Sequence, residues 1–200
     1  MLEERMEREY QMAVEQKTFQ FKALQAQINP HFLFNSLNIL DCLVCEQRTE
    51  QASAYIHKLA GIYRYMLQNE EETLVRLREE MAFVGMYVDL LQVRFPEGFR
   101  VETDISDEAM NRHVLPCSVQ LLIENAIKHN SVGADRPLVI RIVAVAEAVT
   151  VSNNLQLKVS GNPSTRVGLN YIRQQYLDLS GIPIGIRRTD TEYCVTLPLL

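Results

Sequence analysis

The stretch Q-A-Q-I-N-P-H-F-L-F-N-S-L-N-I-L, residues 25–40, organises the first part of the chain. Asn29 can cap a helix, and Pro30 suits the first helical position because the N–H that proline lacks falls where no intrahelical acceptor exists. Apolar residues then recur at helical steps, at Leu33, Leu37, Leu40 and Val44. The pattern predicts a helix that starts or kinks at Pro30 and carries one apolar stripe.

A second stripe of the same helix is polar and contains Gln27, His31, Asn35 and Asn38. An imidazole is a nucleophile near neutral pH when one ring nitrogen is unprotonated, and flanking amides can orient the ring without trapping its proton. His31 is therefore either a phosphate-accepting nucleophile or an ordinary surface histidine at a helix start. A phosphate donor elsewhere in the chain would favour the first interpretation.

Composition limits the classes of function. The chain has 200 residues, 47% of them apolar, which is enough for one ordinary domain or two small ones. Its formal charge of -5 provides no basic field of the kind that nucleic-acid binding requires, so we expect no nucleic-acid partner. The sequence contains no apolar run of about 18 residues and no signal-peptide pattern, which predicts a soluble chain.

Cys42 and Cys45 form a C-x-x-C pair within the helical pattern, with no second pair at zinc-site spacing. This favours buried thiols in a reducing compartment over a metal or redox site.

A second helix follows the polar break at Glu46–Glu50. Its predicted apolar face contains Ile56, Leu59, Tyr63 and Met66. The short connection predicts an antiparallel helical hairpin, and pairing with a second copy in a four-helix bundle would cover its seams, which indicates a homodimer. The acidic cluster at Asn69–Glu72 marks the expected boundary between domains at residues 1–72 and 73–200.

The second part alternates helical and strand patterns. We expect helices over 77–91, 116–130 and 169–179, strands over 99–105, 139–145, 149–153, 184–188 and 193–197, and a flexible loop over 160–168. This order predicts helices layered on one side of a mostly antiparallel sheet, an α+β sandwich.

The stretch V-L-P-C-S-V-Q-L-L-I-E-N-A-I-K-H-N, residues 114–130, predicts a helix with an apolar and a polar face. The predicted apolar face contains Val119, Leu122, Ile123, Ala126 and Ile127. On the polar face, Glu124 and Asn125 lie one turn before Lys128 and His129, so an oxygen ligand for a hard cation and a cation for phosphate can point the same way. The alternative is a solvated face with an ordinary ion pair.

Taken together, Q-I-N-P-H-F-L-F-N-S-L-N and L-L-I-E-N-A-I-K-H-N resemble the LytS/YehU-type sensor histidine kinases, and I-Y-R-Y-M-L, L-R-E-E-M-A-F-V-G-M-Y and V-R-F fall in order between them. The resemblance implies a dimerising phosphoacceptor hairpin followed by a GHKL-type (Bergerat) ATP-binding domain with a mobile lid, using ATP and Mg²⁺. It also implies a response regulator receiver domain as partner. An upstream membrane sensor region would place the chain at the cytoplasmic side of the bacterial inner membrane.

The resemblance also implies roles for single residues. His31 corresponds to the phosphoacceptor, and Asn35 to the amide that positions water for dephosphorylating the regulator. Asn125 corresponds to the Mg²⁺ ligand. Many other histidine kinases have an acidic residue after the histidine, where this chain has Phe32, so Glu124 is the candidate general base. The remaining expected nucleotide contacts are Lys128, His129, Asn153, Arg166, Gly168 and Leu169.

Departures from the family pattern fall in the expected nucleotide pocket. Asn153 replaces the aspartate that accepts a hydrogen bond from adenine, Leu155 replaces a glycine of the same motif, and Arg166 replaces the first lid glycine. Besides the autokinase, they leave open a dimeric signalling scaffold that binds nucleotide weakly or not at all. A third reading is a GHKL enzyme that hydrolyses ATP, with Glu124 activating water.

Overall fold

The computed structural model describes residues 30–69, 72–158 and 167–200. The chain divides into two compact units, residues 1–53 and 54–200, and each is described by itself. Helix α2 (Pro30–Cys45) belongs to the first unit, whereas helix α3 (Thr49–Gln68) begins in the first unit and continues into the second.

Helix α2 occupies the predicted place, but its apolar stripe is only partly covered. Leu37 and Val44 are exposed, while Ser36 and Leu43 are buried. The helix was therefore predicted correctly, and the exposed Leu37 and Val44 leave part of its apolar stripe uncovered within one chain. Cys42 and Cys45 are also exposed, contrary to the expectation of buried thiols.

Helix α3 is also present as predicted, with a different buried face. The buried residues are Ala52, Tyr55, Leu59 and Ile62, so Leu59 is the only buried residue of the predicted face. Ile56 is exposed, and Tyr63 and Met66 are half-buried. Two apolar stripes overlap on this helix, and the periodicity alone did not separate them.

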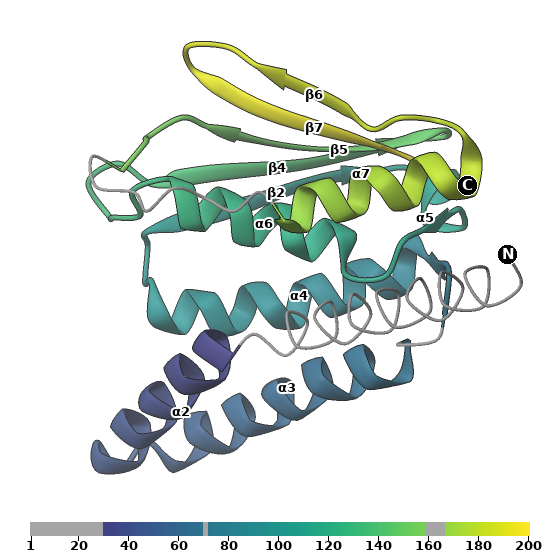
Figure 1. Ribbon diagram of the computed structural model, residues 1–200. Helices are drawn as coiled ribbons and strands as arrows, with labels where there is room; N and C mark the ends of the chain where they lie inside the picture. Colours follow the sequence, from purple (N-terminus) through teal and green to yellow (C-terminus); the bar gives the residue numbers. More distant parts are fainter. Residues whose placement is uncertain (1–29, 70–71, 159–166) are drawn as a thin grey trace, which may run out of the picture. The chain divides into compact units, whose positions relative to one another are not determined.

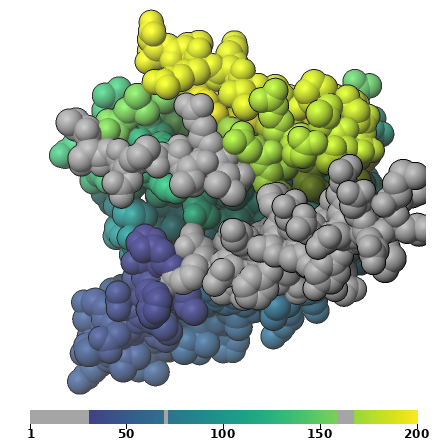
Figure 2. Space-filling model, viewed as in Figure 1, coloured from purple at the N-terminus to yellow at the C-terminus, as the bar shows by residue number. Residues whose placement is uncertain are grey.

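The second unit contains a five-stranded mixed sheet. Its strands, in spatial order, are β2 (Phe99–Ile105), β4 (Leu138–Val145), β5 (Ala148–Asn154), β7 (Glu192–Pro198) and β6 (Gly185–Arg188). β2 pairs in parallel with β4, and the other neighbours are antiparallel. The edge strand β6 is exposed along its length, and its hairpin with β7 forms the yellow rim at the top of Figure 2.

Three helices lie on one side of this sheet: α4 (Leu77–Arg94), α6 (Ser118–His129) and α7 (Val167–Ser180). α6 contacts strands β4 and β5 on one side and α4 on the other, with α7 beside it (Figure 1). The five apolar residues predicted for the inner face of α6 are all buried. The predicted α+β sandwich, with helices on one side of the sheet, is confirmed.

Small elements complete the second unit. β1 (Val75–Arg76) pairs with β3 (His113–Val114), and the one-turn helix α5 (Asp107–Met110) is capped by the side chain of Ser106. These short elements were not predicted. Among the helices in the described ranges, none combines the length and apolarity needed to cross a membrane.

Candidate functional site

The polar face of α6 carries the predicted cation ligand and phosphate contacts. Asn125 is half-buried, and within residues 30–69, 72–158 and 167–200 no hydrogen-bond partner of its side chain is found. Lys128 is exposed. Partial burial lowers the pKa of His129, and the neighbouring charges of Lys128 and Lys158 lower it further. Both effects favour the neutral imidazole.

The last turn of α6 is fastened to the segment that follows β5. Lys158 Nζ donates to the carbonyl oxygens of Ile127 and Lys128 at 3.1 and 3.0 Å, which satisfies two free carbonyls at the helix end. The buried Asn130 donates to the carbonyl of Ala126 at 2.8 Å and accepts from the backbone N–H of Gln156, also at 2.8 Å. Sequence reasoning missed both Lys158 and Asn130, whose partners include residues about 30 positions away.

Asn153 lies near the end of β5, on the same face as the buried residues Val149 and Val151, as predicted. Its Nδ2 donates to the carbonyl of Asn154 at 2.8 Å. Only an NH₂ group can donate there, so Oδ1 points the other way and is left as an acceptor. An aspartate in this conformation would place a carboxylate oxygen against the carbonyl of residue 154, so asparagine suits the local backbone.

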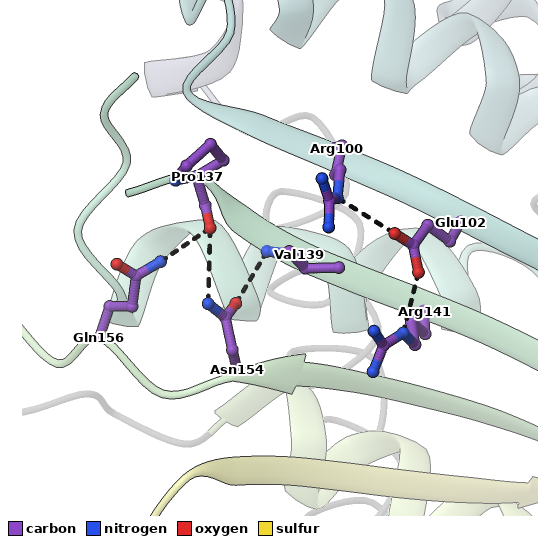
Figure 3. Close-up of polar contacts among 7 residues, drawn as sticks. All are labelled: Arg100, Glu102, Pro137, Val139, Arg141, Asn154 and Gln156. Carbon is purple, nitrogen blue, oxygen red and sulfur yellow. Dashed lines mark hydrogen bonds and ion pairs between the residues drawn. The ribbon is translucent and has the colours of Figure 1, made fainter. Parts of the chain in front are cut away.

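The next residues hold this strand end rigidly (Figure 3). Asn154 Oδ1 accepts from the backbone N–H of Val139 at 2.7 Å. Asn154 Nδ2 and Gln156 Nε2 both donate to the carbonyl of Pro137, at 3.4 and 3.1 Å. The strand end that presents Asn153 is therefore fixed to the start of β4.

The predicted lid residues lie at the start of α7. A Cβ added to Gly168 would lie 2.9 Å from Leu121 Cδ1, so the missing side chain allows α7 to approach α6 closely. Leu121 lies one turn before Asn125 on the same face of α6. Leu169 is half-buried. Arg166 and most of the predicted loop at residues 160–168 lie outside the described residues.

The first turn of α6 is held by a buried carboxyl group that sequence reasoning missed. Glu80 of α4 is fully buried, and its Oε1 accepts from the backbone N–H groups of Val119 and Gln120 at 3.0 and 3.4 Å. Its Oε2 accepts from the N–H of Cys117 at 2.9 Å. Burial raises the pKa of Glu80 to about 7, although its hydrogen bonds act in the opposite direction.

Glu124, the candidate base, is oriented by Gln120. The side-chain Nε2 of Gln120 donates to Glu124 Oε2 at 3.1 Å, one turn along the helix. Tyr87 of α4 also hydrogen-bonds the Gln120 side chain, and burial is the main cause of its raised pKa, ahead of the nearby Glu124 charge. The carboxylate next to Asn125 is therefore held by Gln120 of the same helix, which Tyr87 of α4 contacts in turn.

His31 and Asn35 lie together on α2, in the first unit. His31 is exposed, and Asn35 Nδ2 lies 3.1 Å from His31 Nδ1 and 3.2 Å from Nε2. Because a neutral imidazole has one unprotonated nitrogen, the amide can donate to that nitrogen in either tautomer. The predicted polar stripe thus brings these two side chains into contact.

The donor set on the second unit suits a nucleotide with Mg²⁺. Among the described residues, no group of three His, Cys, Asp or Glu side chains is placed to hold a metal ion. Mg²⁺ does not require such a group, since it keeps several waters and binds through one or two protein oxygens together with phosphates. Asn125 would supply an amide oxygen, Lys128 a cation for phosphate, and Asn153 an acceptor for an amino group.

Comparison with known proteins relates the chain to one family. The histidine kinase family matches residues 19–99. The sensor protein LytS of Bacillus cereus is 42% identical over 110 residues, which are 55% of this chain and 18% of that protein. The sensor histidine kinase/phosphatase LytS of Staphylococcus aureus is 37% identical over 113 residues, 56% of this chain and 19% of that protein. The matched stretch is thus less than a fifth of either relative's length.

Among solved structures, the histidine kinase AdeS of Acinetobacter baumannii is similar, with a TM-score of 0.43 and 14% identity. The match covers 92% of this chain and 96% of that chain.

Proposed function

We propose, on the premise that this chain belongs to the LytS-type sensor histidine kinases, that it is the kinase core of a two-component system. ATP would bind where the second half of α6 meets the end of β5. The observation that supports this most is the pair of amide side chains, Asn125 and the buried Asn153, on elements tied together by Asn130 and Gln156. His31 would receive the γ-phosphoryl group.

The chemistry of the acceptor follows from its surroundings. The unprotonated ring nitrogen of His31 attacks the γ-phosphorus, forming an N–P bond while the bond to the ADP oxygen breaks. The other ring nitrogen then releases its proton, for which we propose Glu124 as base. Asn35, whose amide N–H lies within hydrogen-bond distance of the ring, would release the attacking nitrogen as the N–P bond forms. Asn125 would hold Mg²⁺, which would supply positive charge against the phosphates.

The phosphoryl group would pass from His31 to an aspartate of a response regulator receiver domain. The name of the Staphylococcus aureus relative also includes a phosphatase. We extend this activity to the present chain through Asn35, whose amide would position the water that dephosphorylates the regulator.

We assign residues 1–72 to dimerisation and phosphoacceptance and residues 73–200 to nucleotide binding. Phe34, Leu37 and Val44 of α2 are exposed apolar side chains, which supports a homodimer in which a second copy covers them. In the whole protein, a membrane sensor region would precede this chain.

Incubation with γ-labelled ATP and Mg²⁺ tests the proposal. Acid-labile label should appear on the wild type and on the His113→Gln control, whose histidine is exposed on β3, and should be absent from His31→Gln. Label that persists on His31→Gln would contradict the assigned acceptor. An unlabelled wild type would contradict the kinase activity, and phosphate release that persists in His31→Gln would favour ATP hydrolysis instead.

A dimeric signalling scaffold that binds nucleotide weakly is the second candidate. It is favoured by Asn153, which is uncharged and uses its NH₂ group on its own backbone. A neutral acceptor forms a weaker hydrogen bond with adenine than a carboxylate does. Calorimetric titration with a non-hydrolysable ATP analogue separates the two candidates, because the scaffold predicts no measurable heat at concentrations that saturate an active kinase.

A further inference from the structure

We infer that Glu80 is a positioning residue for nucleotide binding, which holds the first turn of α6 and connects it to Tyr65 on α3. The inference rests on the proposed nucleotide site, because α6 carries Asn125. Glu80 itself would touch neither nucleotide nor metal. It would set the orientation of the helix that does.

The first turn of α6 has no cap of its own. The residue before it, Cys117, has a left-handed backbone with φ of 59° and makes no side-chain capping bond. A helix N-terminus carries unsatisfied N–H groups and a partial positive charge, both of which an acidic group satisfies. Here the acidic group is Glu80, which comes from another helix. The orientation of α6 therefore depends on where α4 places this carboxyl group.

The fourth donor to Glu80 comes from α3. Tyr65 Oη donates to Glu80 Oε2 at 2.8 Å, and the Tyr65 ring stacks on Phe83 of α4 with centroids 4.3 Å apart and an interplanar angle of 11°. Lys58 of α3 also pairs with Asp89 of α4 at 2.6 Å. The second half of α3 is thus docked on α4, and its position reaches the buried carboxyl group through the Tyr65 hydroxyl.

A continuous set of polar contacts leads from Glu80 toward the nucleotide site. Gln120 donates its backbone N–H to Glu80 and its side-chain Nε2 to Glu124, the residue next to Asn125. A movement of α3 that withdraws the Tyr65 hydroxyl would change the group that holds Gln120. Nucleotide affinity should therefore respond to a side chain on α3 that lies outside the ATP site.

Tyr65→Phe and Glu80→Gln in the full chain test the inference. Phenylalanine keeps the ring stack and removes only the hydroxyl. Glutamine keeps the size of the side chain but cannot accept at both oxygen positions. Its NH₂ group would face either the Tyr65 and Cys117 donors or the Val119 and Gln120 N–H groups. Tyr63→Phe is the matched control, since the buried Tyr63 hydroxyl has no hydrogen-bond partner in the described structure.

Two measurements separate positioning from general stability. By calorimetry with ATP and Mg²⁺, we expect the dissociation constant to rise about threefold in Tyr65→Phe and about tenfold in Glu80→Gln, and to change less than twofold in Tyr63→Phe. In ¹⁵N NMR spectra without nucleotide, the backbone amide signals of Val119 and Gln120 should shift in Tyr65→Phe, although residue 65 lies on another helix. A change confined to local stability at α3 would not move these signals.

Three results would contradict the positioning role of Glu80 or the nucleotide site on which it rests. Folded Tyr65→Phe and Glu80→Gln variants with wild-type affinity and unmoved amide signals would overturn the inference. An equal loss of affinity in Tyr63→Phe would do so too, because it would reflect general destabilisation. If the wild type itself binds no ATP, the proposed function fails. The amide signals of Val119 and Gln120 then decide alone whether Tyr65 acts on α6 through Glu80.

Discussion

Helices α2 and α6 carry the two halves of the proposed chemistry, and they differ in how far their apolar residues are buried. α6 buries its whole predicted apolar face between the sheet and α4. α2 leaves Phe34, Leu37 and Val44 exposed by 66%, 46% and 60%. The proposed nucleotide-binding half is therefore organised within one chain, whereas the proposed acceptor half keeps an apolar surface that a second copy could cover.

The largest effect is expected from removing the carboxyl group that fixes α6. Glu80→Ala should lower the free energy of unfolding of the second unit by about 3–5 kcal/mol, because three backbone N–H groups and one hydroxyl lose their acceptor. Urea denaturation followed by circular dichroism measures this. Glu79→Ala is the control, since the exposed Glu79 accepts a single N–H from Arg76 and should cost about 1 kcal/mol. Equal losses of unfolding free energy in Glu80→Ala and Glu79→Ala would contradict the stabilising role assigned to Glu80.

The same group should make stability depend on pH. The pKa of Glu80 is raised to about 7 in the folded protein, so between about pH 4.5 and 7 the folded state holds a proton that the unfolded state has released. The contribution to stability is complete below this window and is lost as pH rises through it, by up to about 3 kcal/mol. Urea unfolding of the wild type and of Glu80→Gln at pH 5, 6, 7 and 8 measures the difference. If the unfolding free energies of the wild type and Glu80→Gln changed with pH in parallel, Glu80 would not be the source of the pH dependence.

Removing the proposed Mg²⁺ ligand should affect chemistry and leave the fold intact. Asn125→Ala should reduce the initial rate of His31 labelling about 100-fold, roughly 2.7 kcal/mol. The melting temperature should stay within two degrees or so of the wild type, because the side chain has no partner among the described residues. Asn170→Ala, at an exposed position on α7, is the control. A normal rate in Asn125→Ala would place the metal elsewhere.

The smallest effect tests the exposed surface of α2. Leu37→Glu should weaken dimerisation about tenfold, roughly 1.4 kcal/mol, because a charge would enter an apolar contact between copies. Sedimentation equilibrium measures the dissociation constant. Val145→Glu is the control, since Val145 is 65% exposed on β4 of the second unit. A wild type that is monomeric at every concentration tested would contradict the proposed homodimer.

The sequence was most informative where burial follows from local periodicity. The inner face of α6 and the hairpin of β4 and β5 were predicted because each repeats apolar residues with one clear period. On α3, two apolar stripes overlap, and the buried Tyr55 and Ile62 lie outside the stripe that contains Ile56 and Tyr63. Periodicity gives the structure of an element, but its packing partners decide which of two stripes is covered.

Some residues of the candidate site could be predicted from local sequence patterns, and others could not. Asn125 and Asn153 could be picked out because motifs mark them, and the structure places them on elements joined near their ends. Glu80 and Lys158 could not be found, because their partners are backbone groups 30–40 residues away and nothing in their own neighbourhood signals the contact. Long-range bonds to the main chain leave no pattern in a sequence.

The parallel pairing of β2 with β4 also has a consequence for how the chain reaches this fold. The two hairpins, β4–β5 and β6–β7, can form from neighbouring residues, but Phe99 finds its partner Leu138 only after α5, β3 and α6 have been synthesised between them. Pairing over such a separation is slow. Until it occurs, residues 99–105 present unpaired strand edges to other molecules. Chains terminated before β4 are therefore the forms of this protein that we expect to aggregate.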